Sequence, residues 1–309
     1  MSGFREITSG LKFPEGPVAM SDGSVVLVEI EGQCITRVAP DGRKTVVAKT
    51  GGGPNGAAIG PDSKLYVCNN GGFVYHHHEG YGITMPAGVA PDYAGGSIQR
   101  VDLQTGAVET LYTHAGEVPL RGPNDIVFDA EGGFWFTDHG KSWPRSRDRV
   151  GVFYARPDGS FIEEVAFPME NPNGIGLSPD GKRLYVAETY TCQLWAFDIA
   201  APGKIAPTSG LFPHGGRFLF RPAGFKHFDS LAVDSAGNIC VATIGEGGIT
   251  VVAPDGQSSS FVPTPDLFPT NICFGGPELR TAYITLSGTG KLVSMEWPRP
   301  GLALHWLNI

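Results

Sequence analysis

Residues 172–189 read PNGIGLSPDGKRLYVAET, and this stretch decides the fold because the chain repeats its pattern. The apolar run PNGIGL precedes a turn sequence, SPDGK, and a second run that contains aromatic and β-branched residues. Two such runs around a cluster of Ser, Pro, Asp and Gly are typical of two antiparallel strands joined by a tight turn. The pattern recurs as EGPVAMSDGSVVLVEI (15–30), PNGAAIGPDSKLYVCNN (54–70), PNDIVFDAEGGFWFTD (123–138), FDSLAVDSAGNICVATI (228–244) and TNICFGGPELRTAYITL (270–286).

A second pair of strands is expected after each of these stretches, so the chain divides into six units of four strands. The second pairs lie at 35–47, 98–112, 151–165, 193–207, 249–262 and 291–307. The polar residues that open the units are Glu15, Asn55, Asn124, Asn173, Asp229 and Asn271, separated by 40, 69, 49, 56 and 42 residues. Repeats of about 40–50 residues with four strands each indicate a β-propeller.

We therefore expect an all-β fold in which residues 1–309 form one domain, a six-bladed β-propeller with four antiparallel strands per blade. The last unit shows only three clear strands, so the N-terminal strand FREIT, at 4–8, would supply the fourth and close the ring. The loops between second and third strands, and the links between blades, lie on one face of such a ring. Long segments at 70–96, 115–123, 138–149 and 209–228 fall there, together with the six opening residues, and predict a site at that face.

Composition and charge exclude several classes of function. The chain has 23 Lys and Arg against 31 Asp and Glu, a net charge of −8, and it contains no basic run. Binding to nucleic acid or to an anionic membrane is therefore not expected. Five cysteines without CxxC spacing argue against a zinc ribbon or a disulfide framework. With no secretory signal pattern at the start, the sequence predicts a cytoplasmic protein.

The opening residues of four units form a candidate metal site. Glu15, Asn124, Asn173 and Asp229 begin inner strands, which surround the axis of a propeller, so their side chains should converge. Carboxylate and amide oxygens suit Ca²⁺, Mg²⁺ or Mn²⁺. The alternative is that Asn and Asp at strand starts cap local Asx turns, although Glu15 does not fit that role. Asn55 completes the ring beside the site.

These motifs resemble the senescence marker protein, regucalcin and gluconolactonase family. The resemblance rests on FPEGPV at 13–18 and on the third, fourth and fifth units quoted above, in the right order along the whole chain. It implies a six-bladed propeller that holds one divalent metal, most often Ca²⁺, with Zn²⁺, Mn²⁺, Mg²⁺ or Fe²⁺ as alternatives. The implied ligands are Glu15, Asn173 and Asp229, and Asn124 would bind either metal or substrate.

The resemblance also suggests which residues contact the substrate. Arg121 is the nearest counterpart of a substrate-binding Arg of some relatives, with one residue more before Asn124 than in the regucalcin-like pattern. Many bacterial relatives have FTDP where this chain has FTDHGKS, which places His139 at the pocket. Tyr190 follows a second strand and should emerge at the same face. The loop FVYHHHEGY at 73–81 is either solvated or a flap whose His77 or Tyr81 touches substrate.

The common reaction of that family is hydrolysis of sugar lactones such as gluconolactone, so the resemblance implies a carboxylic-ester hydrolase. Attack on a lactone places negative charge on its carbonyl oxygen, which a divalent cation stabilises while a carboxylate accepts a proton from water. We expect Asp229 to be the base, with Glu15 as the rival. The alternatives are hydrolysis of a phosphotriester or fluorophosphate on the same metal, and a metal-binding propeller without catalysis. The sequence has no GxSxG motif of a serine hydrolase.

Overall fold

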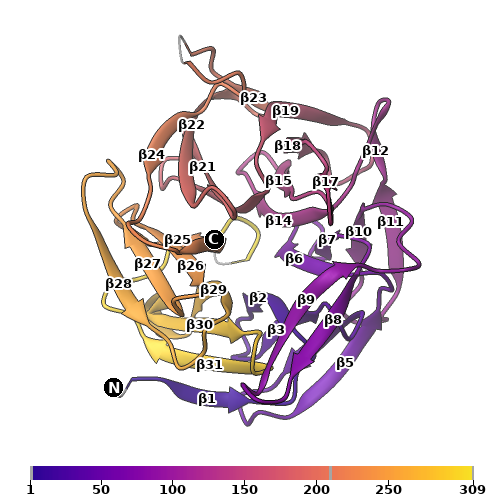
Figure 1. The fold of residues 1–309 in the computed structure, drawn as a ribbon, viewed down its shortest axis with the longest axis vertical. Helices are drawn as coiled ribbons and strands as arrows, with labels where there is room; N and C mark the ends of the chain where they lie inside the picture. The colour runs from indigo at the N-terminus through magenta and orange to yellow at the C-terminus, as the bar shows by residue number, and fades with distance from the viewer. Residues whose placement is uncertain (1–2, 209–210, 308–309) are drawn as a thin grey trace.

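The computed structural model describes residues 3–208 and 211–307, and within them six antiparallel sheets surround a central axis (Figure 1). The six-bladed β-propeller is confirmed. Each blade follows one unit of the sequence repeat, and its first strand lies innermost. The inner strands are β2 (Pro14–Ala19), β6 (Pro54–Ile59), β14 (Pro123–Phe128), β20 (Pro172–Leu177), β25 (His227–Val233) and β29 (Pro269–Gly275).

The other strands follow outward in sequence order within each blade. Blades 1 and 2 continue with β3 (Val25–Glu29), β4 (Cys34–Val38) and β5 (Lys44–Lys49), and with β7 (Leu65–Asn69), β10 (Ser97–Val101) and β11 (Val108–Tyr112). Blades 3 and 4 continue with β15 (Phe134–Asp138), β18 (Val150–Ala155) and β19 (Ile162–Met169), and with β21 (Arg183–Glu188) and β22 (Gln193–Ala201). Blades 5 and 6 continue with β26 (Ile239–Ile244), β27 (Gly248–Val252) and β28 (Ser259–Pro263), and with β30 (Thr281–Leu286) and β31 (Lys291–Glu296).

The N-terminal strand closes the ring, as the count of strands predicted. Strand β1 (Arg5–Thr8) pairs antiparallel with β31 as the outer strand of blade 6, with Arg5 opposite Ser294. The amine of Lys291 lies 2.9 Å from the carboxylate of Glu6 across this pair. Because first and last segments share one sheet, the ring is held shut by backbone hydrogen bonds.

The outer edge of blade 4 differs from the prediction. The stretch 193–207 was expected to supply both outer strands, but it forms the long β22 and only a two-residue partner, β23 (Lys204–Ile205). The edge is completed by β24 (Arg217–Phe220), which pairs with the first part of β22. The segment 209–228 is therefore not wholly irregular, and residues 209 and 210 lie outside the described part of the chain.

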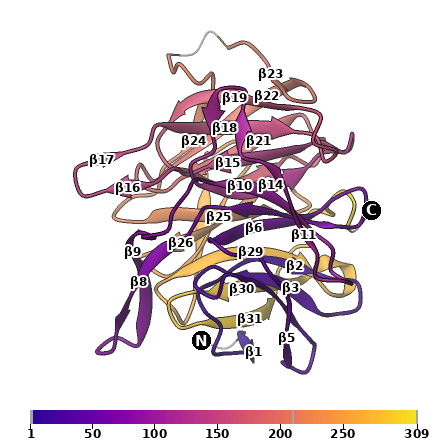
Figure 2. The ribbon, with the colours of Figure 1, turned by 90° about the vertical axis from the view of Figure 1, so that its right-hand side faces the viewer.

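Hairpins project from the face that carries the loops between second and third strands, here called the upper face. They are β8–β9 (Phe73–His78, Ile83–Val89) and β16–β17 (Ser142–Trp143, Ser146–Arg147), seen on one side of the ring in Figure 2. A smaller pair, β12–β13 (His114–Ala115, Val118–Pro119), links blades 2 and 3. The long segments at 70–96, 115–123 and 138–149 therefore contain hairpins and are not irregular throughout, and they lie at the predicted face.

Apolar side chains fill the spaces between neighbouring blades. Tyr66 of blade 2 packs against Phe128 and Phe134 of blade 3, with ring centroids 5.1 and 5.7 Å apart. Trp135 and Trp195 are buried in the layer between blades 3 and 4. Truncating one buried aromatic side chain of this kind costs about 3–5 kcal/mol of stability. The packed layers therefore fix the blades that carry the site.

The five cysteines are all buried and unpaired. Cys68, Cys240 and Cys273 lie in β7, β26 and β29. Cys192 lies in the turn before β22 with a φ of 57°.

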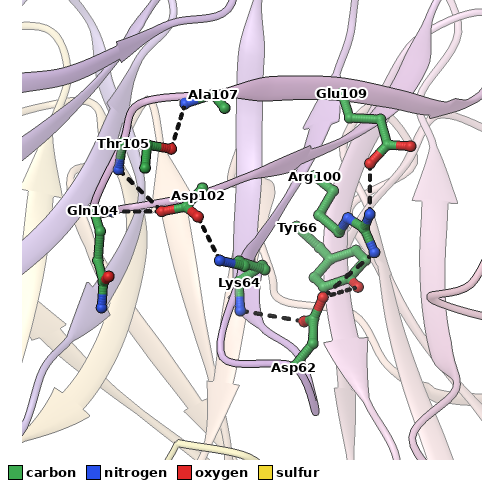
Figure 3. Close-up of polar contacts among 9 residues, drawn as sticks. All are labelled: Asp62, Lys64, Tyr66, Arg100, Asp102, Gln104, Thr105, Ala107 and Glu109. Carbon is green, nitrogen blue, oxygen red and sulfur yellow. Dashed lines mark hydrogen bonds and ion pairs between the residues drawn. The ribbon is translucent and has the colours of Figure 1, made fainter.

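A polar network joins the two turns of blade 2, β6–β7 and β10–β11, at the lower end of the blade (Figure 3). The amine of Lys64 donates to Asp102 Oδ2 at 2.5 Å, and Asp102 Oδ1 accepts the backbone N–H groups of the following turn. Arg100 pairs with Glu109 at 2.6 Å and with Asp62 at 3.5 Å. These contacts hold one blade's turns in place and lie away from the upper face.

The segment that follows β31 crosses the opposite, lower face. Gly301 bridges Asp234 of blade 5, and the indole of Trp306 donates to the backbone oxygen of Asp129 in the first turn of blade 3. A cavity of about 220 Å³ lies above this segment, lined by inner strands of all six blades and by residues such as Leu302 and Leu307. The lower end of the channel is thereby covered. No helix within the described ranges has the length and apolarity that a membrane crossing requires.

Candidate metal centre

Irregular pairing directs the opening residues of the inner strands toward the channel. In all six inner strands the register shifts at or beside that residue, for example between Glu15 and Val18 and between Phe228 and Leu231. Such bulges re-aim side chains and are common beside functional sites. Glycines allow the strands to approach closely: a Cβ on Gly16 would lie 2.4 Å from the backbone oxygen of Asn55. The opening residues of the six inner strands therefore lie around one end of the channel, here called the neck: Glu15, Asn55, Asn124, Asn173, Asp229 and Asn271.

Glu15 is buried and held by two donors. Its Oε2 accepts the backbone N–H of Gly16 at 2.6 Å and the side-chain amide of Asn271 at 2.7 Å. Only 3% of the residue is exposed. Burial raises the pKa of Glu15 to about 7, although the two hydrogen bonds oppose the shift. The carboxylate is thus fixed in position without a compensating positive charge.

Asp229 faces Glu15 and Asn173 from blade 5. Burial, followed by the negative charge of Glu15, raises the pKa of Asp229 well above its usual value, while the amide of Asn173 opposes that rise. Asn173 is itself oriented, since its Nδ2 donates to Thr189 Oγ1 at 3.1 Å. Its Oδ1 is left with a long contact of 3.4 Å from Ser230 Oγ. The amide oxygen is therefore available to another partner.

Several buried polar atoms near the upper face lack a hydrogen-bond partner within the described residues. The side-chain oxygens of Asn124 and Asn55 belong to the ring of opening residues, and Asn70 Nδ2, Tyr75 Oη and His139 Nδ1 lie on segments that follow second strands at that face. Leaving such an atom unpaired costs about 1–3 kcal/mol, so a run of them marks a place where ligands supply the missing contacts. Unpaired amide oxygens beside two carboxylates fit a hard divalent cation.

No ion pair among the described residues neutralises Glu15 or Asp229. Nor do residues 3–208 and 211–307 contain a group of three or more His, Cys, Asp and Glu placed to hold a metal ion. The donor set at the neck is instead half carboxylate and half carboxamide. Such a set favours an oxygen-seeking ion over one that needs imidazole or thiolate ligands.

Asp125 is a buried acid that the sequence reasoning missed. Its Oδ1 accepts the N–H of Ile126 at 3.0 Å, and its Oδ2 accepts that of Ile175 at 3.4 Å. Burial, followed by the charge of Glu15, raises the pKa of Asp125 to about 8. A signal was present, because the second and fourth units have PNG where the third has PND. Asp125 therefore stands where the other two units have a glycine that packs closely against a neighbouring inner strand.

Arg121 lies at the upper face but outside the ring of opening residues. Its side chain is 46% exposed, and its Nε is 3.9 Å from Asp148 Oδ1. The backbone N–H of Arg121 donates to the buried Asp138 at 2.7 Å, which fixes the start of the loop. Its role toward substrate stays a prediction, as does that of Asn55 in the ring.

His139 and Tyr190 lie beside each other at the mouth, with ring centroids 6.2 Å apart. Burial and the nearby charge of Lys141 lower the pKa of His139 to about 4, so the imidazole is neutral at physiological pH. Tyr190 is half exposed. Their proximity is consistent with the predicted contact to substrate, which stays a prediction.

The segment 73–81, expected as a loop, forms strand β8 and the tip of the β8–β9 hairpin. His77 contacts Glu31 of blade 1 at 3.0 Å and Thr84 of β9 at 2.9 Å. These contacts attach the β8–β9 hairpin to blade 1. Tyr81 is at the exposed tip. Tyr75, which the sequence reasoning missed, packs its ring 5.1 Å from that of Phe13 and leaves its buried hydroxyl unpaired.

The fold and the neck together define a class: six-bladed propellers with carboxylate and carboxamide oxygens converging at one end of the channel. The chain belongs to the SMP-30/Gluconolactonase/LRE-like family, whose model matches residues 13–288. It is 26% identical to the gluconolactonase of Zymomonas mobilis over 91% of this chain and 78% of that protein. It is 28% identical to the diisopropyl-fluorophosphatase of Loligo vulgaris over 96% of this chain and 93% of that protein.

A solved structure supports the fold. The gluconolactonase from Xanthomonas campestris superposes with a TM-score of 0.74 and 23% identity, covering 96% of this chain and 89% of that chain. The similarity extends along the whole propeller and concerns its fold.

Proposed function

We propose that residues 1–309 form a single catalytic domain that hydrolyses a lactone with the help of one divalent metal ion. The observation that carries the proposal is the convergence of Glu15 and Asp229 beside Asn173 and the unpaired oxygen of Asn124. Glu15 is buried and Asp229 is half-buried, and two such carboxylates are costly to keep charged unless a positive ion joins them. The enzyme class follows from the family: the chain is a carboxylic-ester hydrolase of the lactonase type, like the relative named gluconolactonase.

Glu15, Asn124, Asn173 and Asp229 would hold the ion, and their oxygen donors favour Ca²⁺ over Zn²⁺, Mn²⁺, Mg²⁺ or Fe²⁺. When bound, the ion supplies Lewis acidity toward the carbonyl oxygen of the substrate.

The protein's own groups perform the remaining tasks. Asp229 is our candidate base, because one of its carboxylate oxygens can hold the ion while the other accepts a proton from water. Glu15 is the rival, but its Oε2 already accepts from Gly16 and Asn271, which suits a fixed ligand. Thr189 orients Asn173 by accepting from its Nδ2. These contacts hold the carboxylates and amides in place before the substrate arrives, as preorganised sites require.

Arg121, His139, Tyr190, Asn55 and Asn124 would contact the substrate. The partner is a small molecule that enters from the upper face, because the lower end of the channel is covered. Gluconolactone is the first substrate to test. A cytoplasmic location is part of the proposal, because the five cysteines are unpaired, as they are in a reducing compartment.

A second candidate is hydrolysis of a fluorophosphate or phosphotriester at the same neck. The specific support is the relative named diisopropyl-fluorophosphatase, which is similar along nearly the whole chain. The same acids could serve, since a phosphoryl oxygen develops charge as a carbonyl oxygen does. A metal-binding propeller without catalysis would need no proton acceptor beside the ion.

The deciding experiment begins with metal analysis of the purified protein and a pH-indicator assay with gluconolactone. A fluoride electrode would follow diisopropyl fluorophosphate in parallel. Chelation should abolish hydrolysis and added Ca²⁺ should restore it. Asp229→Asn and Glu15→Gln should each lower kcat/KM by about 100-fold or more, and exposed Asp255→Asn should leave it unchanged. Full activity in excess chelator would overturn the metal mechanism, and cation binding without turnover on either substrate would favour the non-catalytic reading.

A further inference from the structure

We propose that a band of four aromatic rings at the upper mouth receives an apolar substituent of the substrate. The band consists of His139, Tyr190, His227 and Phe225. It rests on the proposed function and names the substrate class: lactones that carry a hydrocarbon or aromatic group, in preference to fully hydroxylated aldonolactones.

The rings are contiguous across three blades. His139 of blade 3 lies 6.2 Å from Tyr190 of blade 4, and Tyr190 lies 5.7 Å from His227 of blade 5 at an interplanar angle of 89°. His227 in turn lies 4.4 Å from Phe225. The three centroid distances, from 4.4 to 6.2 Å, fall at or near the range of about 4.5–7 Å that is favourable for aromatic pairs. The band is therefore one surface.

The band lies beside the proposed reacting groups. His227 precedes Asp229 by two residues on β25. Tyr190 follows Thr189, which accepts the hydrogen bond from Asn173. The backbone oxygen of His139 accepts from the side chain of Asn171, two residues before Asn173. A lactone held between Asp229 and Asn173 would thus have the band along one side.

The exposed part of the band is apolar. Phe225 is 76% exposed and Tyr190 is 50% exposed, a large aromatic area for the rim of a channel. Lys226 stands between Phe225 and His227, but its amine pairs with Glu246 at 2.7 Å and lies 4.8 Å from the centre of the Phe261 ring. Its charge is directed away from the band. Neutral His139 adds no charge at the other end.

Apolar surface of this kind should bind an apolar ligand more tightly than a hydroxylated one. Sugar hydroxyls need donors and acceptors to replace water, and the rings of Phe225 and Tyr190 offer mostly faces and edges. Covering a phenyl-sized group would strengthen binding by about tenfold to a hundredfold. The gain would appear in KM, since the substituent does not take part in the bond changes.

The test compares γ-phenyl-γ-butyrolactone with gluconolactone in the metal-loaded enzyme. We expect the phenyl lactone to have a kcat/KM at least about tenfold higher, and Phe225→Ala or His227→Ala to reduce this preference by about tenfold through KM. Phe161→Ala, with a 41% exposed ring in the lower turn of blade 3, is the matched control and should leave the preference unchanged. A preference for gluconolactone, or an equal loss on both substrates in the band variants, would overturn the inference.

A binding measurement separates this inference from the proposed function. The lactam 5-phenyl-2-pyrrolidinone resists hydrolysis, so its affinity by calorimetry does not depend on turnover. We expect it to bind at least about tenfold more tightly than 2-pyrrolidinone, with the difference lost in Phe225→Ala. If neither lactone is hydrolysed but the two lactams differ in affinity as expected, the proposed function is wrong and the aromatic band is still supported as a binding site. Equal affinities for the two lactams would overturn the band whatever the activity.

Discussion

The side-chain amide of Asn271 donates to Glu15 Oε2 at 2.7 Å, which joins the first and last inner strands of the propeller across 256 residues of sequence. Blade 6 is also the blade that the N-terminal strand completes. The contact that positions the buried carboxylate therefore depends on closure of the ring. Metal affinity and the integrity of the blade 6–blade 1 junction should be linked.

Asn271→Leu tests that link. The variant removes one of the two donors to Glu15 Oε2 and keeps the N–H of Gly16, so the free energy of unfolding should fall by about 1–3 kcal/mol. Ca²⁺ affinity should fall as well, because the carboxylate is less firmly held. Urea unfolding and calcium titration measure the two effects. Gln257→Leu, at an exposed turn of blade 5, should change neither. Unchanged calcium affinity in Asn271→Leu would show that the junction does not support the site.

Asn124 and Asn55 both carry a buried oxygen without a partner, and substitution separates their roles. We expect Asn124→Ala to weaken divalent binding by about tenfold or more, as loss of a ligand does. Asn55→Ala should leave that affinity nearly unchanged and raise KM instead. Calcium titration and steady-state kinetics on both variants give the answer. The reverse order of affinities would move the ligand role to Asn55.

Tyr75→Phe removes a buried hydroxyl that has no partner. Stability should be unchanged or increase by up to about 1 kcal/mol, because no hydrogen bond is lost. Activity should fall several-fold if the hydroxyl meets substrate at the neck. Tyr66→Phe is the matched control: its hydroxyl donates to Asp62 at 3.1 Å, so stability should fall by about 1 kcal/mol while activity persists. A loss of stability in Tyr75→Phe would mean that the hydroxyl has a structural partner.

The number of blades and the closure of the ring could be predicted because both depend on local signals. Each SPDGK-like turn lies between two apolar runs, and counting these runs leaves one strand short until FREIT is added. The outer edge of blade 4 could not be predicted in the same way. Strand β24 reaches β22 after a long excursion, and nothing in RFLF distinguishes this late partner from the nearer KI of β23.

The ring of opening residues was also predictable, because equivalent places in a repeat converge on the axis. The individual hydrogen bonds were not predictable. The repeat placed Asn271 in the ring but did not reveal its bond to Glu15, and the hydroxyl of Tyr75 lies on a hairpin that crosses from blade 2 to blade 1. The pairing of Phe225 with His227 lies in a segment without a repeat counterpart. Such contacts depend on how the blades are placed in space.

His139 should make the protein acid-sensitive. Its pKa is lowered to about 4 in the folded state by burial and by Lys141, against an ordinary value near 6.5. Between these values the unfolded chain binds a proton that the folded chain does not, so stability rises with pH there and is lost as pH falls from about 6.5 to 4. At pH 4 the lowered pKa of His139 should reduce the free energy of unfolding by roughly 2–3 kcal/mol relative to its value at neutral pH. Urea unfolding across this range, in the wild type and in His139→Gln, measures it. Identical pH profiles would show that another group is responsible.

The C-terminal crossing of the lower face should depend on one ion pair. Arg299 Nε lies 2.6 Å from Asp234 Oδ2, and Asp234 is fully buried. Asn238 also donates to this carboxylate, at 2.8 Å to Oδ2. Arg299→Met would leave the buried carboxylate of Asp234 with N–H donors as its only partners. Removing one member of an ion pair lowers the free energy of unfolding by several kcal/mol when both members are buried. Because Arg299 is 42% exposed, we expect a smaller loss of about 1–3 kcal/mol in urea unfolding.

Arg43 provides the matched control, because its pair with Asp41 is exposed on both sides. Arg43→Met should change stability by less than about 0.5 kcal/mol. In Arg299→Met, the hydrogen bond from the indole of Trp306 to Asp129 should also open more often. Hydrogen exchange of that indole and of the Gly301 amide would report the loosening. Equal stabilities and exchange rates in the two variants would show that apolar contacts, such as those of Leu302 and Leu307, hold the segment over the channel without help from the ion pair.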